Sequence, residues 1–352
     1  MDNLTHLLVG LTLSRTPLRR AGPGTFATLL VASNVPDAEV LTVLTSGRIA
    51  YLESHRSAMH GPLGLVGLAL LTAAVVRWWP LPSGRRGGEL RRFWPLTAVA
   101  LTAALGHVLL DFATSYGTRV LSPFSEIWMG ADWLPILEPY LIVLLVAGLV
   151  AGRLRPEARA RIAALTLVLA MCLGGGRALL HEVAIGRARR SPAPNQGAAG
   201  DTAALASAPG PVFRYLWPSL PPELPAALPT TWSPFRWRIV RAVPGGYEVS
   251  ELDLLRNTPR LPAVFHPRAE GPWVELASQA PTPRVFVAFM RFPAVYVSRR
   301  PNGDVMVRWN DIRFAPPGRV SAPDGSHPAS HFGAWARLTP EGRLVGHGLG
   351  SG

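Results

Sequence analysis

The sequence contains no lysine, a single cysteine and few charged residues for its length. Of its 352 residues, 16% are charged and 48% are hydrophobic, and the mean hydropathy is +0.21. This composition is too apolar for an ordinary soluble domain of this size, so it indicates a membrane protein. The single cysteine, Cys172, excludes an internal disulfide, and because it lies in an apolar stretch we interpret it as a small packing residue.

All 35 basic residues are arginine, and the formal net charge is +13. A charge of this size can indicate nucleic-acid binding, because clustered cations release counterions from a phosphate backbone. Here, however, the arginines lie at the ends of apolar segments rather than along one face, and no groove-reading motif accompanies them. Nucleic acid is therefore not an expected partner.

Long apolar runs are concentrated in the first half of the chain. The runs 61–76 and 94–110 contain no formally charged side chain and approach the roughly 20 residues that span a bilayer. Two other runs are interrupted by Glu138 and Arg177, and a third is broken at Pro36, which favours a tilted or re-entrant segment there. We predict a mainly α-helical polytopic membrane bundle over residues 1–190. Its six hydrophobic segments are 4–18, 24–45, 61–76, 94–110, 133–152 and 162–180.

Arginine placement predicts the orientation of this bundle, because short loops rich in arginine stay on the cytoplasmic side. Three clusters, near residues 15–20, 85–92 and 153–161, fall on one face if there are six spans. The N-terminus carries no positive leader before its first apolar segment, so we expect that segment to be retained rather than cleaved. Everything after residue 181 is then predicted to face outward.

Residues 191–211 are small, polar and proline-rich, which is typical of a flexible linker. Beyond it, residues 212–352 predict a small β-rich extramembrane domain, because short apolar runs alternate with turn residues. Pro301 to Asp304 predict a hairpin turn between two of these runs. The predicted strands are 237–240, 246–249, 284–290, 294–297 and 305–309.

The membrane half also carries ionisable residues, which are costly at membrane depth and therefore indicate a purpose. His107 and Asp111 are separated by four residues, so both side chains lie on one face of a helix. There they can share a divalent ion, or the carboxylate can orient the imidazole. A buried hydrogen-bonded pair that joins two helices is the structural alternative.

Three further groups accompany this pair in the sequence. His55 and His60 are five residues apart, so on a helix they diverge and one of them is expected on the turn before residue 61. Asp37 and Glu39 follow a proline, where a helix breaks and carboxylates can point at a shared ion. His6 lies in the first turn of the first segment. Interfacial histidines and a helix-breaking aspartate are the structural alternatives.

Several linked motifs together resemble a known family. The segments MDNLTHLLVGLTLSR, NVPDAE, YLESHRSAMHG, HVLLDFATSYGTR and ADWLPILEPYL are similar, in this order, to the YdjM-like family of metal-dependent hydrolases associated with the bacterial inner membrane. The tail segments TTWSPFRWRIV and WNDIRF resemble the family's outer domain more loosely. The resemblance implies that six residues are ligands or near-ligands of a metal ion: His6, Asp37, His55, His60, His107 and Asp111.

The sequence departs from the family pattern at three positions. Glu39 replaces the second aspartate of Pro-Asp-x-Asp, which keeps the charge but lengthens the side chain. Met59 replaces a threonine before His60, which removes a hydroxyl group. Glu138 stands where an aspartate is expected, and we assign it no role.

These residues lead to the hypothesis of a membrane-bound hydrolase that uses a divalent ion to activate water. Mixed nitrogen and oxygen ligands suit zinc first, with manganese or iron as alternatives. Glu39 or Asp37 is the candidate general base, and Arg56 is a candidate for binding an anionic substrate or developing negative charge. The expected partners are membrane lipids and a small-molecule, lipid-linked or phosphoester substrate.

Two other functions remain open from the sequence. A transporter could use the same histidines and aspartates as a proton relay. A non-catalytic receptor or scaffold could act through the β-rich domain, with the polar cluster serving the fold. No partner spacing supports a role for the remaining histidines, which are His181, His266, His327, His331 and His347.

Overall fold

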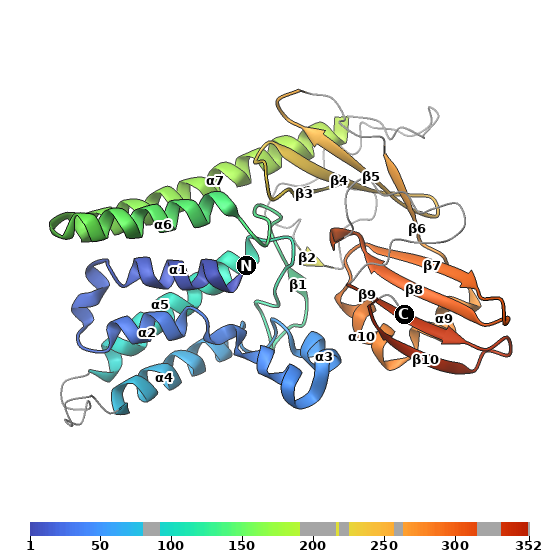
Figure 1. The fold of residues 1–352 in the computed structure, drawn as a ribbon, viewed down its shortest axis with the longest axis horizontal. Helices are drawn as coiled ribbons and strands as arrows, with labels where there is room; N and C mark the ends of the chain where they lie inside the picture. The colour runs from blue at the N-terminus through green and yellow to red at the C-terminus, as the bar shows by residue number, and fades with distance from the viewer. Residues whose placement is uncertain (80–91, 191–215, 218–224, 257–262, 315–331, 351–352) are drawn as a thin grey trace. The chain divides into compact units, whose positions relative to one another are not determined.

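The computed structural model describes residues 1–79, 92–190, 216–217, 225–256, 263–314 and 332–350 (Figure 1). The chain forms two compact units. The first comprises Met1–Leu41, Ser54–His181 and Pro229–Pro234, and the second comprises Thr42–Glu53, Glu182–Leu228 and Phe235–Gly352. The predicted linker at 191–211 lies outside the described residues, and the boundaries predicted at 190 and 212 remain predictions.

The first half of the chain is helical, as its apolar runs predict (Figure 1). Asp2 caps the first helix by accepting a hydrogen bond from the Thr5 backbone amide at 2.9 Å. Pro62 and Pro139 begin two others, at positions where a proline costs no internal hydrogen bond. The elements are α1 (Asn3–Leu13), η1 (Pro17–Ala21), α2 (Thr25–Ala32), η2 (Val35–Leu41), α3 (Thr42–Ser54), α4 (Pro62–Trp78), α5 (Phe93–Phe112), β1 (Trp128–Met129), α6 (Pro139–Leu154), η4 (Pro156–Ala158) and α7 (Arg159–Arg190).

Small side chains let α2, α4 and α5 approach one another closely. Ala32, Ala69 and Ala100 are at most 1% exposed and belong to one cluster of buried side chains with Leu29. Such small residues are typical of helix interfaces in membranes, where backbones pack directly. The packing fixes α5, which carries His107 and Asp111, between two other helices.

The six predicted hydrophobic segments are not supported as six full spans. Two helices, Phe93–Phe112 and Pro156–Arg190, are long and apolar enough to cross a membrane, and Thr25–Ala32 with Val35–Ser54 makes a third if this pair, bent by 53°, counts as one span. The other apolar helices in the described residues are shorter: α4 has 17 residues and α6 has 16. A 17-residue helix is about 26 Å long, which is less than the hydrocarbon thickness of about 30 Å. The apolar composition of α4 and α6 is that of full spans, but their length is not.

The environment of Cys172 also differs from the prediction. This residue is exposed on α7, rather than packed among other side chains. Exposed apolar side chains are abundant on the same helix, including Leu165, Met171 and Leu179 at 58%, 69% and 71% exposure. Such a surface is compatible with lipid contact, so an apolar neighbourhood in the sequence does not imply burial within the protein.

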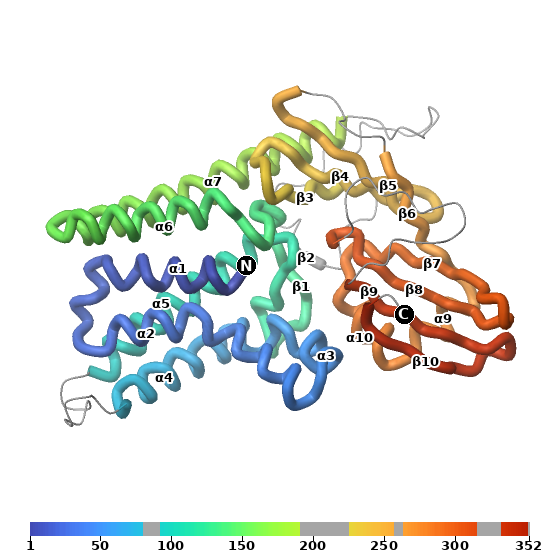
Figure 2. Tube along the Cα trace, viewed as in Figure 1, coloured from blue at the N-terminus to red at the C-terminus, as the bar shows by residue number. Residues whose placement is uncertain are grey.

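The second unit contains two four-stranded antiparallel sheets, with strand orders β3-β4-β5-β6 and β10-β9-β8-β7 (Figure 2). A bridge between Arg268 and Val295 connects the two sheets. The predicted strands at 237–240, 246–249, 294–297 and 305–309 are confirmed, and the 301–304 turn joins β7 to β8. The strands are β2 (Leu216–Trp217), β3 (Ala226–Pro229), β4 (Arg236–Val243), β5 (Gly246–Asp253), β6 (Val264–Pro267), β7 (Pro293–Arg299), β8 (Val305–Asp311), β9 (Gly333–Leu338) and β10 (Leu344–Leu349).

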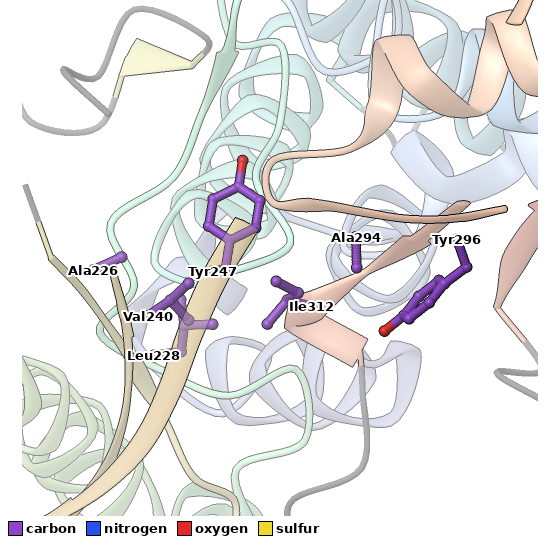
Figure 3. Close-up of a cluster of buried hydrophobic side chains, with 7 residues drawn as sticks. All are labelled: Ala226, Leu228, Val240, Tyr247, Ala294, Tyr296 and Ile312. Atoms are coloured by element: carbon purple, nitrogen blue, oxygen red, sulfur yellow. The ribbon is translucent and has the colours of Figure 1, made fainter. Parts of the chain in front are cut away.

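The cluster of buried side chains in Figure 3 draws on both sheets of this unit. Leu228 and Val240 come from the first sheet, and Ala294 and Tyr296 from the second. Ile312, in the short helix Ile312–Phe314 that follows β8, completes the contact at 1% exposure. This shared core joins the two sheets through side chains as well as through the backbone bridge.

The strand predicted at 284–290 is wrong, because these residues belong to the helix α10 (Pro281–Phe289), which follows the helix α9 (Pro272–Ser278). A short apolar run fits either a buried strand or one face of a helix. In the structure Thr282, Phe286 and Phe289 are all buried, which is the spacing of one helical face. Pro281 also stands at the first helical position, where proline is favoured.

This helical face leads to a prediction. Phe286→Ala and Phe289→Ala each remove a ring that is at most 2% exposed, and each is expected to lower the free energy of unfolding by about 3–5 kcal/mol. Val287→Ala, at 40% exposure, is the matched control and is expected to cost less than about 1 kcal/mol. Denaturant titration of the purified chain measures all three. A strand would instead bury Phe286 and Phe289 on opposite faces, so a neutral Phe289→Ala contradicts the helix.

Candidate metal centre

The helix α5 presents His107 and Asp111 on one buried face, as their four-residue spacing predicts. Their exposed fractions are 2% and 0%, and His107 Nε2 lies 3.3 Å from Asp111 Oδ2. His107 Nδ1 lies 2.8 Å from the carbonyl oxygen of Ser33, which can only accept. The proton is therefore on Nδ1, and the Nε2 lone pair points toward Asp111 and its neighbours.

Two other segments bring a second aspartate and a second histidine to this face. Asp37 comes from η2, and His60 from the turn before α4. Ligand atoms of Asp37, His60, His107 and Asp111 all lie within 4.8 Å of one another, and we call these residues the four-residue cluster. Three of them are buried, whereas the side chain of Asp37 is 12% exposed.

The turn that carries His60 is held by a close backbone contact. A Cβ atom at Gly61 would lie 1.7 Å from the carbonyl oxygen of Ser122, so only glycine fits there without displacing the chain. The His60 amide donates to the carbonyl oxygen of Ser57 at 2.8 Å. These two contacts fix the backbone on both sides of the imidazole.

The distances within the four-residue cluster suit a shared cation. His60 Nε2 lies 3.2 Å from Asp111 Oδ2, 3.3 Å from His107 Nε2 and 3.6 Å from Asp37 Oδ1, and His107 Nε2 also lies 3.6 Å from Asp37 Oδ1. Two ligands that are each about 2.1 Å from a tetrahedral zinc ion stand about 3.4 Å apart. The spacing of these atoms therefore matches that of ligands around one ion.

Buried polar atoms without hydrogen-bond partners also support a cation at this place. Among the described residues, Asp37 Oδ1, His60 Nδ1 and Asp111 Oδ2 are buried and have no hydrogen-bond partner. Leaving such atoms unpaired costs free energy. A cation would satisfy both carboxylate oxygens at once, because Asp37 Oδ1 and Asp111 Oδ2 each lie within 3.6 Å of His60 Nε2 and His107 Nε2.

His6 lies beside the four-residue cluster rather than within it. Its ring stacks on that of His107, with centroids 3.7 Å apart, and its Nε2 atom lies 3.3 Å from Asp111 Oδ1. Both nitrogens of His6 lack a hydrogen-bond partner among the described residues. His6 is therefore positioned to approach an ion from the other side of Asp111.

Glu39 and His55 form a separate pair next to the cluster. Glu39 Oε1 accepts from His55 Nδ1 at 2.7 Å and from the Arg56 amide at 2.5 Å. Glu39 Oε2 lies 3.9 Å from His60 Nδ1. The geometry of His55 is thus set by Glu39, and His55 is not among the residues whose ligand atoms converge.

The electrostatic environment keeps both histidines of this turn uncharged at neutral pH. Burial, with the charge of Arg56, lowers the pKa of His55 to about 3. Burial lowers the pKa of His60 to about 4, although the nearby carboxylates of Asp37 and Glu39 oppose this shift. A neutral imidazole is the form that binds a metal ion.

Arg56 is buried and engaged with the protein. It donates to Asp111 Oδ1 at 2.9 Å and to the carbonyl oxygen of Gly117 at 3.0 Å, and it lies over the ring of Tyr116. The roles of Gly117 and Tyr116, and of the Ser33 carbonyl, were not predicted from the sequence. The only signal was that the segment TSYGTR directly follows the helix with His107 and Asp111.

Comparisons with known proteins find a family that matches the first half of the chain. A family described as YdjM inner membrane protein matches residues 1–182, which include the four-residue cluster. A Bacillus subtilis (strain 168) protein named "Uncharacterized protein YfhP" is 23% identical over 152 residues. That match covers 41% of this chain and 43% of the relative, so less than half of the relative is represented. No solved structure is significantly similar.

The two aspartates lead to contrasting predictions for stability without metal. Asp111 is fully buried and pairs with Arg56, so Asp111→Asn leaves a buried guanidinium without its counter-charge. We expect it to lower the free energy of unfolding by about 3 kcal/mol. Asp37→Asn removes a carboxylate that is 12% exposed and lies 3.6 Å from the Nε2 atoms of His60 and His107, and it is expected to cost less than Asp111→Asn because no buried guanidinium is left without its direct partner.

Denaturant titration in mixed micelles with an excess of chelator measures both effects, because the chelator removes any contribution from bound metal. Equal losses for Asp111→Asn and Asp37→Asn would contradict the assigned pairing of Asp111 with Arg56.

Proposed function

The chain belongs to the YdjM inner membrane protein family, and we propose that it is a membrane-bound, metal-dependent hydrolase. One observation carries the proposal: Asp37, His60, His107 and Asp111 direct ligand atoms to one place within 4.8 Å of one another. Two imidazole nitrogens and two carboxylate oxygens suit zinc first, and manganese or iron second. An ion held there would supply Lewis-acid activation of water.

The residues around the cluster have distinct tasks in this proposal. The Ser33 carbonyl holds the tautomer of His107, and Arg56 pairs with Asp111. Glu39 remains our candidate for accepting a proton from water, because its Oε2 atom lies 3.9 Å from the ring of His60. Asp37 is the alternative base. His55 is oriented by Glu39, and both His55 and His6 lie beside the four-residue cluster rather than within it.

The surroundings of Asp37 favour a substrate that reaches the site from the membrane. Asp37 is the most exposed member of the cluster, and Val40 and Leu41 on the same short helix are 47% and 60% exposed. Apolar side chains beside the accessible carboxylate suit an amphiphile whose acyl or prenyl part stays in the bilayer. We therefore propose a lipid-linked or phosphoester substrate.

The ends of the candidate spans support a proposal for orientation. Both α5 and the helix Pro156–Arg190 are preceded or begun by arginines, among them Arg92, Arg155 and Arg159. If these arginines stay on the cytoplasmic side, the other ends of both helices face outward, together with Asp111 and the β-rich residues. Three arginines in the last turn of α7 oppose this arrangement, whereas the arginines at the start of both helices support it.

Metal content is the first test of the proposed function. Detergent-purified protein is expected to contain about one divalent ion per chain, measured by elemental analysis. The double variant His107→Ala, Asp111→Ala is expected to contain none, because it loses one nitrogen and one oxygen ligand. His347→Ala is the matched control, since this histidine bonds Thr282 in the β-rich unit.

Glu39→Gln separates hydrolysis from metal binding in the same preparation. It is expected to keep the ion while turnover of a phosphodiester in mixed micelles falls by about 10²–10⁴-fold, the usual contribution of a general base. A parent protein without stoichiometric metal contradicts the hydrolase and favours the transporter with a proton relay. A Glu39→Gln variant with full turnover contradicts only the role of Glu39 as general base and leaves the metal site untouched.

Reporter fusions after residues 88 and 200 test the orientation. We expect a cytoplasmic signal at 88 and an outer signal at 200, because the arginine-rich ends of the spans are placed inside. A cytoplasmic signal at 200 would reverse the placement of the β-rich unit.

A further inference from the structure

We propose that Arg56 is a positioning residue, which holds Asp111 so that one carboxylate oxygen faces the four-residue cluster. The inference rests on the proposed metal site and concerns how that site is built. It gives Arg56 a different task from binding an anionic substrate, because its guanidinium group is directed into the protein.

The guanidinium group of Arg56 is fixed on three sides. One nitrogen donates to Asp111 Oδ1 at 2.9 Å, and another donates to the Gly117 carbonyl oxygen at 3.0 Å. The group also lies 4.5 Å from the centroid of the Tyr116 ring. Arg56 is only 4% exposed, so these contacts are shielded from water. Because the planar guanidinium group is bonded to two acceptors and stacked on an aromatic ring, it has little freedom to rotate.

The backbone of Arg56 is equally constrained. Its φ angle is +52°, and among the described residues Asp132 is the only other non-glycine residue with positive φ. Such a conformation persists where the surroundings over-determine it. Here the Arg56 amide donates to Glu39 Oε1 at 2.5 Å, and its carbonyl oxygen accepts from the Arg119 amide at 2.9 Å. The 116–119 segment therefore contacts both the backbone and the side chain of Arg56, with Glu39 and Asp111 as the further partners.

The consequence appears at Asp111. Oδ1 is bonded both to Arg56 and to the Met1 amine, and the other oxygen, Oδ2, lies 3.2 Å from His60 Nε2 and 3.3 Å from His107 Nε2. Oδ2 has no hydrogen-bond partner among the described residues, although it is fully buried. Rotation of the carboxylate would break the bond to Arg56, and because Asp111 is 0% exposed, bulk water could not replace that bond. The contact with Arg56 thus leaves Oδ2 directed at the four-residue cluster, where it can bind a metal ion.

Charge and position act in opposite directions here, which makes the proposal testable. The positive charge of Arg56 repels a cation, so its removal would tighten metal binding if charge alone mattered. If Arg56 acts by orienting Asp111, its removal weakens binding instead. Partners that orient metal ligands typically contribute about 10–100-fold to affinity.

The experiment is a Co²⁺ titration of the detergent-purified chain, followed by visible absorption, which reports the coordination of the ion. Arg56→Gln is expected to weaken Co²⁺ binding by about 10–100-fold and to change the absorption spectrum. Arg56→Lys, which keeps the charge but contacts one acceptor at a time, is expected to recover part of the affinity and of the spectrum.

Two further variants control for charge and folding. Arg119→Gln removes a neighbouring positive charge that pairs with Glu126 and does not touch Asp111, and it is expected to leave Co²⁺ affinity within about twofold. Arg56→Gly removes the side chain and relieves the positive φ angle, so it is expected to fold and still to bind Co²⁺ weakly.

The outcomes are distinguishable. Failure of the parent protein to bind Co²⁺ overturns the metal site itself. If the parent binds Co²⁺, and Arg56→Gln binds it equally or more tightly with an unchanged spectrum, the positioning role is overturned but the metal site is not. Loss of folding in all three Arg56 variants also overturns it, because Arg56 would then support the fold as a whole rather than one ligand.

Discussion

The fully buried carboxylate of Asp111 is the constraint around which the helical unit is organised. It lies on a helix packed by alanine and leucine, where an uncompensated charge is costly. Its two oxygens face different groups: Oδ1 faces Arg56, His6 and the Met1 amine, whereas Oδ2 faces His60 and His107. The surrounding residues come from α1, the 55–60 turn and α5, so one side chain links segments that are far apart in the sequence.

Local spacing explains which parts of this arrangement could be predicted from the sequence. His107 and Asp111 are on one helix, where a four-residue separation fixes their relative position. The strands β4, β5, β7 and β8 were predictable because turn residues bound short β-like runs. The place of Asp37 beside His60 depends on tertiary packing, and its prediction needed both the topology inferred from arginine placement and the resemblance to a family.

The incorrect predictions arose where one sequence pattern fits two structures. The helices α4 and α6 have the composition of spans but not the length, and the apolar run at 284–290 fits a strand as well as the buried face of α10. The backbone of Arg56 could not be predicted, because nothing in the sequence marks a positive φ at an arginine. Its conformation follows from Glu39 and Arg119, which lie 17 residues before it and 63 residues after it in the chain.

The charges of the site help to explain why an ion, rather than a proton relay, is the preferred proposal. When the carboxylates of Asp37, Glu39 and Asp111 are all ionised, three negative charges face the single positive charge of Arg56. The Met1 amine adds little, because burial lowers its pKa well below the usual value and favours the uncharged form. A divalent cation would cancel the remaining two negative charges. Protons could do the same, but a proton on Asp37 or Asp111 would not use the converging nitrogen lone pairs of His60 and His107, and these atoms stand at the spacing of ligands around one ion.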